Sequence, residues 1–180
     1  AKKYSVKKQY NSHLEICNHE EIDAFVVTLP RKLSFNVLNH LIKFKKPIFT
    51  EKPLCLDYKN AELLKELAIK HSTFIKVGYM KSHDGSIEKL KQILKESKKN
   101  NDEIKLINSY SFMGDSYCSP FGDIKGKYKP SIVLKEESMP KWLNKGNYFG
   151  YEQFINVFSH ITHIIENIFN EKINLISAKL

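Results

Sequence analysis

The sequence predicts an α/β fold in which helices cover both faces of a parallel sheet. Three β-branched runs, at residues 21–30, 47–50 and 73–79, have the length of core strands, and two segments of helical spacing separate them. Regular alternation of strands and helices is typical of parallel strands joined by crossover helices. The 180 residues are sufficient for one good core or for parts of two.

The predicted elements of the first half follow each other closely. The first strand ends at Thr28, and the helix after it has apolar residues at helical spacing: Leu33, Val37, Leu38, Leu41 and Ile42. The second strand lies around Ile48. The next helix, residues 60–70, places four apolar side chains on one face: Leu63, Leu64, Leu67 and Ala68. Because ligands of parallel sheets bind beyond the carboxyl ends of the strands, we expect Thr28, Lys52 and Gly78 near a ligand.

The second half of the chain has a different pattern. Residues 84–97 have the spacing of a helix with four apolar residues turned inward: Ile87, Leu90, Ile93 and Leu94. Residues 104–112 alternate like a strand of a second sheet, and residues 172–180 read as a strand that begins a sheet. The span 114–130 is rich in Gly, Pro, Ser and Tyr and is predicted to be a loop. We expect the boundary between the two halves at residues 79–85.

The tripeptide Glu51-Lys52-Pro53 stands out because it directly follows a predicted core strand. A proline restricts the residue before it to an extended conformation, so Lys52 leaves the strand end on a stiff turn. Taken alone, the tripeptide is more often a surface Glu-Lys pair that closes a strand. Its place in a series of parallel strands favours an active site.

Four sequence blocks occur in a characteristic order: residues 22–30 (IDAFVVTLP), 51–54 (EKPL), 77–79 (VGY) and 156–165 (NVFSHITHII). With these blocks the chain resembles the family of glucose-fructose oxidoreductase, inositol dehydrogenase and rhizopine catabolism proteins (Gfo/Idh/MocA). The resemblance implies that residues 1–80 are the second half of a Rossmann-type parallel-sheet domain that lacks its N-terminal glycine loop. It implies that residues 81–180 are the first part of an α+β substrate-binding and catalytic domain with an open sheet.

The same resemblance implies an NAD- or NADP-dependent oxidoreductase that transfers a hydride to or from a hydroxyl or ketone of a sugar or sugar derivative. It assigns catalysis to Lys52, His160 and Asn156. The implied cofactor contacts come from Thr28, Pro30, Glu51 and Lys52, and the implied substrate contacts from Lys52, Tyr79, Asn156, His160 and His163. A histidine titrates near neutrality and suits proton transfer, whereas a lysine ammonium can stabilise a developing alkoxide.

Several positions depart from the family pattern. Asn156 stands where the family has an aspartate, and His163 stands where it often has a second one. An amide orients a hydroxyl but takes up no proton, so acid/base duty would fall on His160 alone or be shared with His163. Ser34 and Ser82 stand where many relatives have a histidine and an arginine. These departures keep an alternative open, a non-catalytic family member that binds a sugar or a protein partner without turnover.

The segment that carries the two histidines is strongly apolar. Its large side chains are expected to be core residues: Phe158, Ile161, Ile164, Ile165 and Ile168. One helical turn separates Asn156 from His160, so these two residues are expected to share a helix face. Considered singly, each histidine is also consistent with a packed core residue, and a zinc site of His160 and His163 has no third ligand nearby in the sequence.

The glycine-rich turn of a dinucleotide-binding domain is not found in the sequence. Such a domain opens with a strand and a Gly-x-Gly-x-x-Gly turn that approaches the pyrophosphate, and none occurs in the 180 residues. By resemblance, we expect the chain to cover the middle of a longer protein. In relatives, the region comparable to residues 114–130 borders the substrate, so four residues are candidates for sugar contacts if this is not an ordinary surface loop: Asp115, Tyr117, Asp123 and Lys125.

The chain is basic, with a formal charge of +9 and a pI near 9.3, which raises a nucleic-acid hypothesis. The excess is lysine, Arg31 is the one arginine, and no nucleic-acid-binding motif occurs, so we expect no nucleic-acid partner. A basic cleft would favour an anionic substrate such as a sugar nucleotide or a uronic acid.

Cysteine usage and hydropathy suggest a compartment. Cys17, Cys55 and Cys118 are odd in number and unclustered, which favours a reducing environment over a disulfide framework. No apolar run reaches the roughly 20 residues that span a bilayer, and no signal peptide opens the chain. We therefore expect a cytoplasmic protein without membrane contact, and we also expect a homo-oligomer.

Overall fold

The computed structural model of the protein describes residues 5–18, 21–110, 135–169, 174, 176 and 177. These residues belong to two compact units. The first unit contains the chain up to Gly78 and a later segment that ends at Lys141. The second unit contains the segment that begins at Tyr79 and the chain from Trp142 onwards. The return of the chain to the first unit before Trp142 has no counterpart in the sequence prediction.

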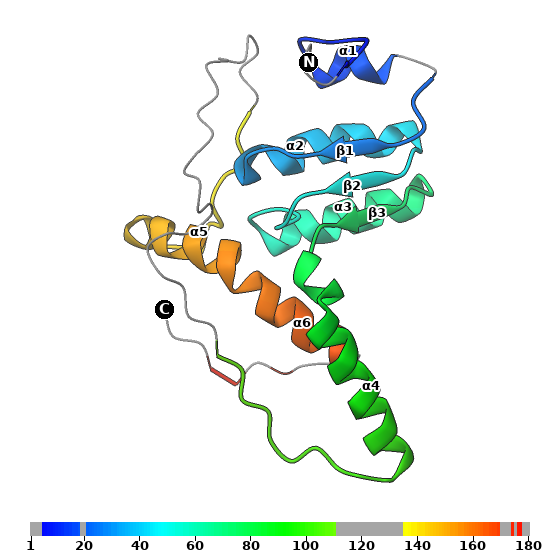
Figure 1. Cartoon of the computed structure of the whole chain (residues 1–180). Coiled ribbons are helices and arrows are strands. Elements are labelled where there is room, and N and C mark those ends of the chain that lie inside the picture. The colour runs from blue at the N-terminus through cyan, green and yellow to red at the C-terminus, as the bar shows by residue number, and fades with distance from the viewer. Residues whose placement is uncertain (1–4, 19–20, 111–134, 170–173, 175, 178–180) are drawn as a thin grey trace. The chain divides into compact units, whose positions relative to one another are not determined.

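The first unit is built on a three-stranded parallel sheet (Figure 1). Strands β1 (Phe25–Val27), β2 (Ile48–Thr50) and β3 (Ile75–Val77) lie in the order β1-β2-β3. Their ends are level, because Val27 pairs with Thr50 and Thr50 with Val77. The predicted α/β class and the three predicted strands are confirmed.

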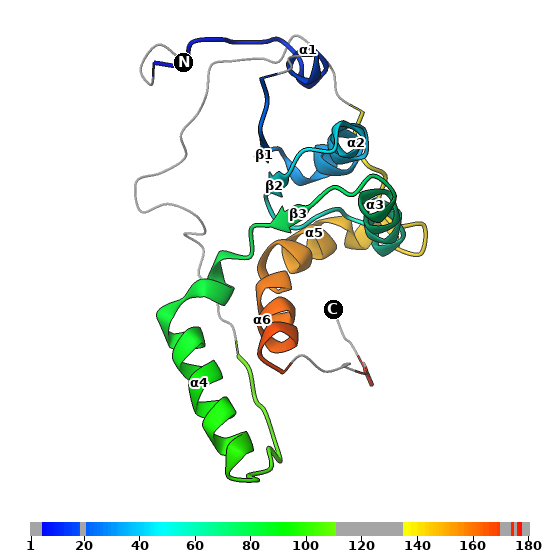
Figure 2. The same cartoon turned by 90° about the vertical axis from the view of Figure 1, so that its right-hand side faces the viewer.

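Two helices connect the strands and cover one face of the sheet (Figure 2). Helix α2 (Arg31–Leu41), continued by the 3-10 helix η2 (Ile42–Phe44), joins β1 to β2, and α3 (Tyr58–Lys70) joins β2 to β3. Asp57 caps α3, since its side chain accepts a hydrogen bond from the Lys59 amide at 3.1 Å. The short α1 (His13–Cys17) is capped by Ser12 in the same way.

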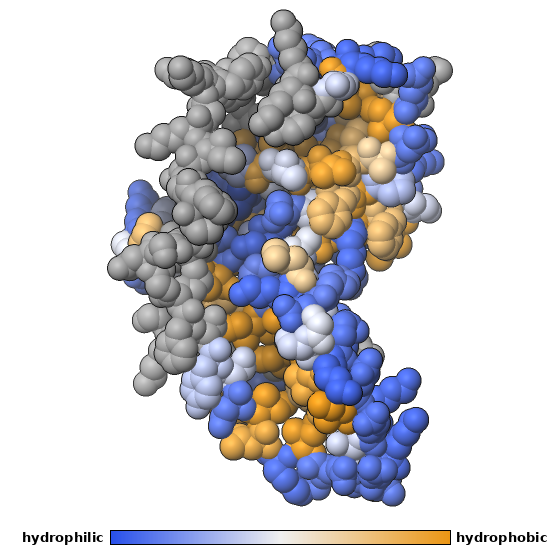
Figure 3. Space-filling view, in the orientation of Figure 1, coloured by the Kyte–Doolittle hydropathy of each residue, from blue (hydrophilic) through white to orange (hydrophobic). Residues whose placement is uncertain are grey.

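The core of the first unit lies between the sheet and these helices. Its buried apolar residues are Cys17, Phe25, Val27, Val37, Leu38, Leu41, Ile42, Ile48 and Leu64. Side chains alternate across a strand, so Val26 and Phe49 point to the other face and are 72% and 44% exposed. The expectation that both faces are covered is therefore wrong for the described structure, and hydrophobic surface is visible over this unit in Figure 3. Leu63, which was expected beside Leu64 on the inner face of α3, is also exposed.

The second unit is helical in the residues that the structure describes. Its elements are η3 (Met80–His83), α4 (Gly85–Lys99), η4 (Lys145–Asn147), α5 (Tyr148–Val157) and α6 (Ser159–Phe169). Asp84 caps α4 through the Ser86 amide at 2.9 Å, yet no residue of α4 is buried. The predicted helix is confirmed, but the prediction of a buried apolar stripe is wrong, since Leu90 and Ile93 are exposed.

The predicted strand at residues 104–112 is wrong as far as the structure describes it. Residues 104–110 form no strand and are exposed, because no neighbouring strand satisfies their backbone groups. Of the predicted strand at 172–180, the described residues 174, 176 and 177 are likewise outside any strand. No helix of the described chain has the length and hydropathy needed to cross a membrane.

A break at Phe158 separates α5 from α6. The Phe158 amide donates to the Phe154 carbonyl at 2.8 Å and ends α5, whereas the Ile161 amide turns to the Phe158 carbonyl at 3.0 Å and begins α6. Asn156 and His160 therefore lie on different helices, and the prediction that a single helix carries both is wrong. The isoleucines of α6 are half-buried and not core residues, and His160 is the buried residue of this helix.

Candidate active site

The carboxyl ends of the three strands bring predicted site residues to one edge of the first unit. Thr28, Glu51 and Gly78 each follow the last residue of a strand. The Glu51 amide donates to the Val27 carbonyl at 3.0 Å, and the Gly78 amide donates to the Thr50 carbonyl at 2.8 Å. These bonds extend the ladder beyond the strands, so the three residues leave the sheet side by side.

Lys52 is held at this edge by its neighbours. Thr50 is fully buried, Pro53 is buried, and the peptide bond between Lys52 and Pro53 is cis. The Lys52 amide donates to Oε2 of Glu51 at 3.1 Å, so the Glu51 carboxylate organises the turn through the backbone. The Lys52 side chain is half-buried, whereas Glu51 is exposed. The chain bends directly after this strand, where the sequence predicted a turn.

Gly78 lets the chain leave the third strand close to the second. A Cβ atom at this position would lie 3.2 Å from Cζ of Phe49 and 3.3 Å from the Thr50 carbonyl oxygen. Both distances are shorter than ordinary van der Waals contacts. A glycine is thus favoured by the close approach of the Phe49 ring and the Thr50 backbone, which is a structural reason for the Val-Gly-Tyr block.

Three predicted site residues meet in the second unit. The Tyr79 ring stacks on His163 with centroids 4.1 Å apart and an interplanar angle of 20°. The same ring meets His160 edge to face, with centroids 5.9 Å apart at 87°. His160 is 8% exposed and His163 is half-buried. Tyr79 therefore fixes both imidazoles of α6 from the start of η3.

The remaining predicted residues are less closely grouped. Thr28 is exposed, and Pro30 is the residue before α2 without a capping side chain. Asn156 is half-buried on α5. The candidate sugar contacts Asp115, Tyr117, Asp123 and Lys125 lie outside the described residues. Among the described residues, no group of three or more His, Cys, Asp or Glu side chains is placed to hold a metal ion.

Glu137 is a functional candidate that the sequence analysis missed. It is 6% exposed, and its carboxylate accepts hydrogen bonds from the Leu56 amide, the Asp57 amide and the Asn60 side chain. These partners lie about 80 residues earlier in the chain, at the start of α3. No sequence signal separates Glu137 from its exposed neighbour Glu136, because neither belongs to a periodic segment.

Cys55 lies beside this carboxylate and is protonated at neutral pH. Burial, together with the negative charge of Glu137, raises the pKa of the Cys55 thiol to about 12. The thiol donates to the Asp57 carbonyl at 3.2 Å. Because the thiolate is the nucleophilic form, this environment disfavours Cys55 as a nucleophile.

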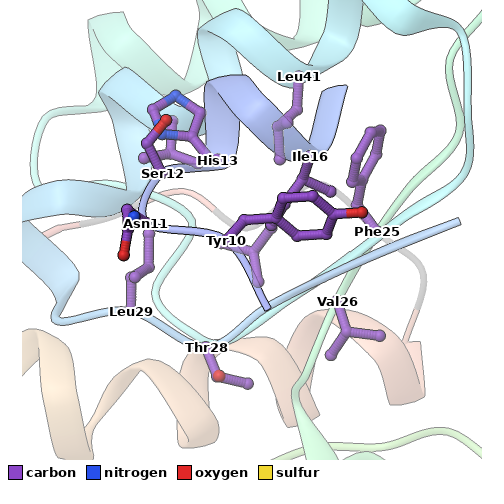
Figure 4. A pocket seen from close by; sticks show the side chains of 12 residues that line it. Tyr10, Asn11, Ser12, His13, Ile16, Phe25, Val26, Thr28, Leu29 and Leu41 are labelled. Carbon is purple, nitrogen blue, oxygen red and sulfur yellow. The ribbon is translucent and has the colours of Figure 1, made fainter. Parts of the chain in front are cut away.

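A cavity of about 320 Å³ lies along β1 in the first unit (Figure 4). Tyr10, Ile16, Phe25 and Leu41 contribute apolar lining, and Thr28 brings the wall to the carboxyl end of β1. His13 lines the same cavity. The lining is mostly apolar, which suits a ring system more than a phosphate group.

The cavity-lining residue His13 contacts a second histidine. The rings of His13 and His40 contact each other edge to face, with centroids 5.3 Å apart. Burial lowers the pKa of both, and electrostatic repulsion lowers it further, between the two imidazoles for His13 and from the Lys43 ammonium for His40. Both imidazoles are therefore held in the neutral form in the folded state.

Residues 1–79 match the sequence profile of an oxidoreductase family with an NAD-binding Rossmann fold, GFO_IDH_MocA. These residues are similar to the Gfo/Idh/MocA family, and the match covers slightly less than half of the chain. The parallel sheet and the turns at its carboxyl edge lie within this match. The predicted resemblance is confirmed for these residues, and the parallel sheet agrees with the Rossmann fold of that family. No curated protein matches the chain.

Solved structures of this kind resemble the chain over about half its length. An NAD binding oxidoreductase from Klebsiella pneumoniae is 23% identical with a TM-score of 0.51, and the match covers 54% of this chain and 26% of that one. Myo-inositol dehydrogenase from Lactobacillus casei, in complex with NAD(H) and myo-inositol, is 27% identical with a TM-score of 0.48, covering 50% and 27%. Myo-inositol 2-dehydrogenase from Lactobacillus plantarum is 22% identical with a TM-score of 0.46, covering 49% and 26%. The chain thus spans about a quarter of the length of these proteins.

Proposed function

We propose that the protein is an NAD- or NADP-dependent oxidoreductase acting on a secondary hydroxyl or ketone of a sugar, sugar derivative or similar polyol. The observation that carries the proposal is the edge formed by Thr28, Glu51, Lys52 and Gly78 at the carboxyl ends of a parallel sheet. This edge lies in the segment that matches an NAD-binding family. In open parallel sheets, ligands bind there.

In the proposed reaction, two side chains of this chain carry the substrate chemistry. Lys52 contacts the reacting oxygen and stabilises the alkoxide as the proton leaves, and His160 takes up or returns that proton. The bound nicotinamide supplies the hydride chemistry, which no side chain provides. Tyr79, Asn156 and His163 are proposed to contact the substrate. An amide at position 156 orients a hydroxyl by hydrogen bonding, which leaves the proton to histidine.

The residues of the first unit fit one end of the cofactor better than the other. Thr28, Glu51 and Lys52 provide a hydroxyl, a carboxylate and an ammonium for the ribose and nicotinamide, and Pro30 is proposed as a further cofactor contact. The glycine-rich turn that receives the pyrophosphate does not occur in the 180 residues, so no residue is assigned to the phosphates. We propose residues 1–80 as the partial dinucleotide-binding domain, residues 81–180 as the partial substrate domain, and a homo-oligomeric assembly.

The proposal is tested by fluorescence titration of NADH and NADPH, followed by turnover assays with inositols, hexoses and their oxidised forms. We expect saturable cofactor binding, and a loss of kcat/KM of about 100-fold or more in Lys52→Ala and His160→Ala, the usual contribution of a positioned acid or base. Lys59→Ala and His83→Ala change exposed residues of the same types and serve as controls.

Two results would contradict this proposal. Turnover within a few-fold of wild type in both Lys52→Ala and His160→Ala would remove these residues from the mechanism. Sugar binding without cofactor binding or turnover would indicate a non-catalytic member of the family.

A further inference from the structure

A segment from the second half of the sequence is fastened to the first unit beside the candidate cofactor edge. We call residues 135–140 the strap. The Asn36 side chain donates to the Lys135 carbonyl at 2.7 Å, and the Glu137 amide donates to the Lys32 carbonyl at 2.6 Å. Pro140, at the other end of the strap, is fully buried. The strap is therefore bound along the beginning of α2.

The Glu137 side chain extends from the strap to the beginning of α3. Its Oε2 accepts from the Leu56 amide at 2.9 Å, and its Oε1 accepts from the Asp57 amide at 3.2 Å and from Nδ2 of Asn60 at 2.6 Å. One carboxylate thus receives three hydrogen bonds from the start of a single helix. The positive end of the α3 dipole and the charge on the acceptor both strengthen these bonds.

The burial of this carboxylate makes its hydrogen bonds hard to replace. Glu137 is 6% exposed and Leu56 is 2% exposed, so water has little access to the carboxylate or to the Leu56 amide. Removing the acceptor would leave buried amide donors unsatisfied, which costs more than the net value of the bonds. The backbone at Leu56 and Asp57 is therefore held in place by Glu137.

The strap joins the first turn of helix α2 to the turn after β2 that carries Lys52. Lys32, which accepts from the strap, is two residues past Pro30 in the turn after β1. Leu56 is four residues past Lys52 in the turn after β2. Glu137 bonds to the first turn of α2 through its backbone and to the turn after β2 through its side chain. A shift of this residue would move one turn relative to the other.

We propose that Glu137 is a positioning residue that sets the place of Lys52 by fixing the 52–57 turn to α2. This inference rests on the proposed function of Lys52 at the cofactor edge. Glu137 itself does not touch the reacting atoms. It acts through the backbone of Leu56 and Asp57, and a displacement of about 1 Å at a reacting group is enough to lower a rate about 100-fold.

The test compares Glu137→Gln with Glu136→Gln in the full-length protein. Both changes remove one negative charge, but only the first affects a residue with buried partners. An amide offers one acceptor oxygen in place of two, so at least one donor at the start of α3 loses its partner. We expect amide hydrogen exchange at Leu56 and Asp57 to be at least about 10-fold faster in Glu137→Gln and unchanged in Glu136→Gln.

Kinetic measurements then test whether Glu137 acts through Lys52. We expect kcat to fall about 10- to 100-fold in Glu137→Gln, with a smaller change in KM for the substrate. In a Lys52→Ala background, Glu137→Gln should have little further effect on kcat, because its action passes through Lys52. A merely structural role would instead multiply the two losses. If Glu137→Gln does not fold, Glu137→Asp, which keeps the charge and shortens the reach, replaces it in both measurements.

The outcomes separate this inference from the proposed function. Unchanged exchange at Leu56 and Asp57 would overturn the positioning role. Faster exchange, with kcat losses of Glu137→Gln and Lys52→Ala that multiply in the double variant, would also overturn it, since Glu137 would then not act through Lys52. If Lys52→Ala is itself fully active, the proposed role of Lys52 fails, whatever the exchange data show for Glu137.

Discussion

Tyr79 contacts both histidines of α6, and its removal has a calculable effect. Tyr79→Leu eliminates the stacked contact with His163 at 4.1 Å and the edge-to-face contact with His160 at 5.9 Å. Aromatic pairs contribute about 0.5–1.5 kcal/mol each beyond their buried area, so the two contacts together amount to about 1–3 kcal/mol. We expect the free energy of unfolding to fall by that amount in urea denaturation.

The pairwise part of this effect is accessible by a double-mutant cycle. The cycle combines Tyr79→Leu with His163→Leu and measures how far the two losses fail to add, which should be about 0.5–1.5 kcal/mol for a stacked pair. Tyr79→Phe keeps the ring and serves as the control, with a loss of stability well below that of Tyr79→Leu. A coupling energy indistinguishable from zero would refute the stacked geometry.

A structural consequence for His160 accompanies the energetic one. Its imidazole is 8% exposed and rests against the edge of the Tyr79 ring. In Tyr79→Leu we expect the His160 ring signals to shift in NMR spectra and its proton exchange with water to become faster. Unchanged His160 signals would mean that Tyr79 does not hold this ring.

Three further predictions concern the first unit. Leu64→Ala should lower the free energy of unfolding by about 2–5 kcal/mol in urea titrations, whereas Leu63→Ala, at a 41% exposed position, should cost far less; similar losses would contradict the burial difference. The pKa of the Cys55 thiol is about 12, against an ordinary 9.0. At pH 8 this thiol should therefore react with iodoacetamide about 1000-fold more slowly in the folded protein than after unfolding, as followed by peptide mass spectrometry. Equal rates would contradict its burial. The pKa values of His13 and His40 are lowered in the folded state, so the unfolded state binds more protons below pH 6.5. The urea midpoint of unfolding should therefore fall as the pH drops from 7.5 to 5.5. In His13→Gln and His40→Gln the midpoint should fall less steeply.

Local patterns in the sequence were sufficient to predict the first unit. The spacing of Val37, Leu38, Leu41 and Ile42 predicts the buried face of α2, and all four are buried. The run around Ile48 predicts a strand, and its register with the neighbouring strands places the Lys52 turn at the carboxyl edge. These predictions succeeded because strand and helix periodicity depends on neighbours within one element.

The failures involve partners that are distant in sequence. Residues 104–110 alternate like a strand, yet a strand requires a neighbour to pair with, and periodicity does not supply one. Helical spacing was extended through Phe158, where the backbone bonds change from one helix to the next. Glu137 bonds to residues about 80 positions away, and a lone glutamate has no local signature of such a role. Polar contacts of this range follow from tertiary structure and not from pattern.

The sequence identified Gly78 as part of the Val-Gly-Tyr block, but it did not predict which atoms surround this residue. A methyl group at this position would meet the Phe49 ring at 3.2 Å and the Thr50 carbonyl oxygen at 3.3 Å. The ring is partly exposed and can move, but the carbonyl is held by the Gly78 amide at 2.8 Å and belongs to a fully buried residue. We expect Gly78→Ala to cost about 1–3 kcal/mol of unfolding free energy, as overpacking does. Phe49→Ala removes one of the two obstacles, so the double variant should recover only part of the loss, and full recovery would show that the backbone contact is not the constraint.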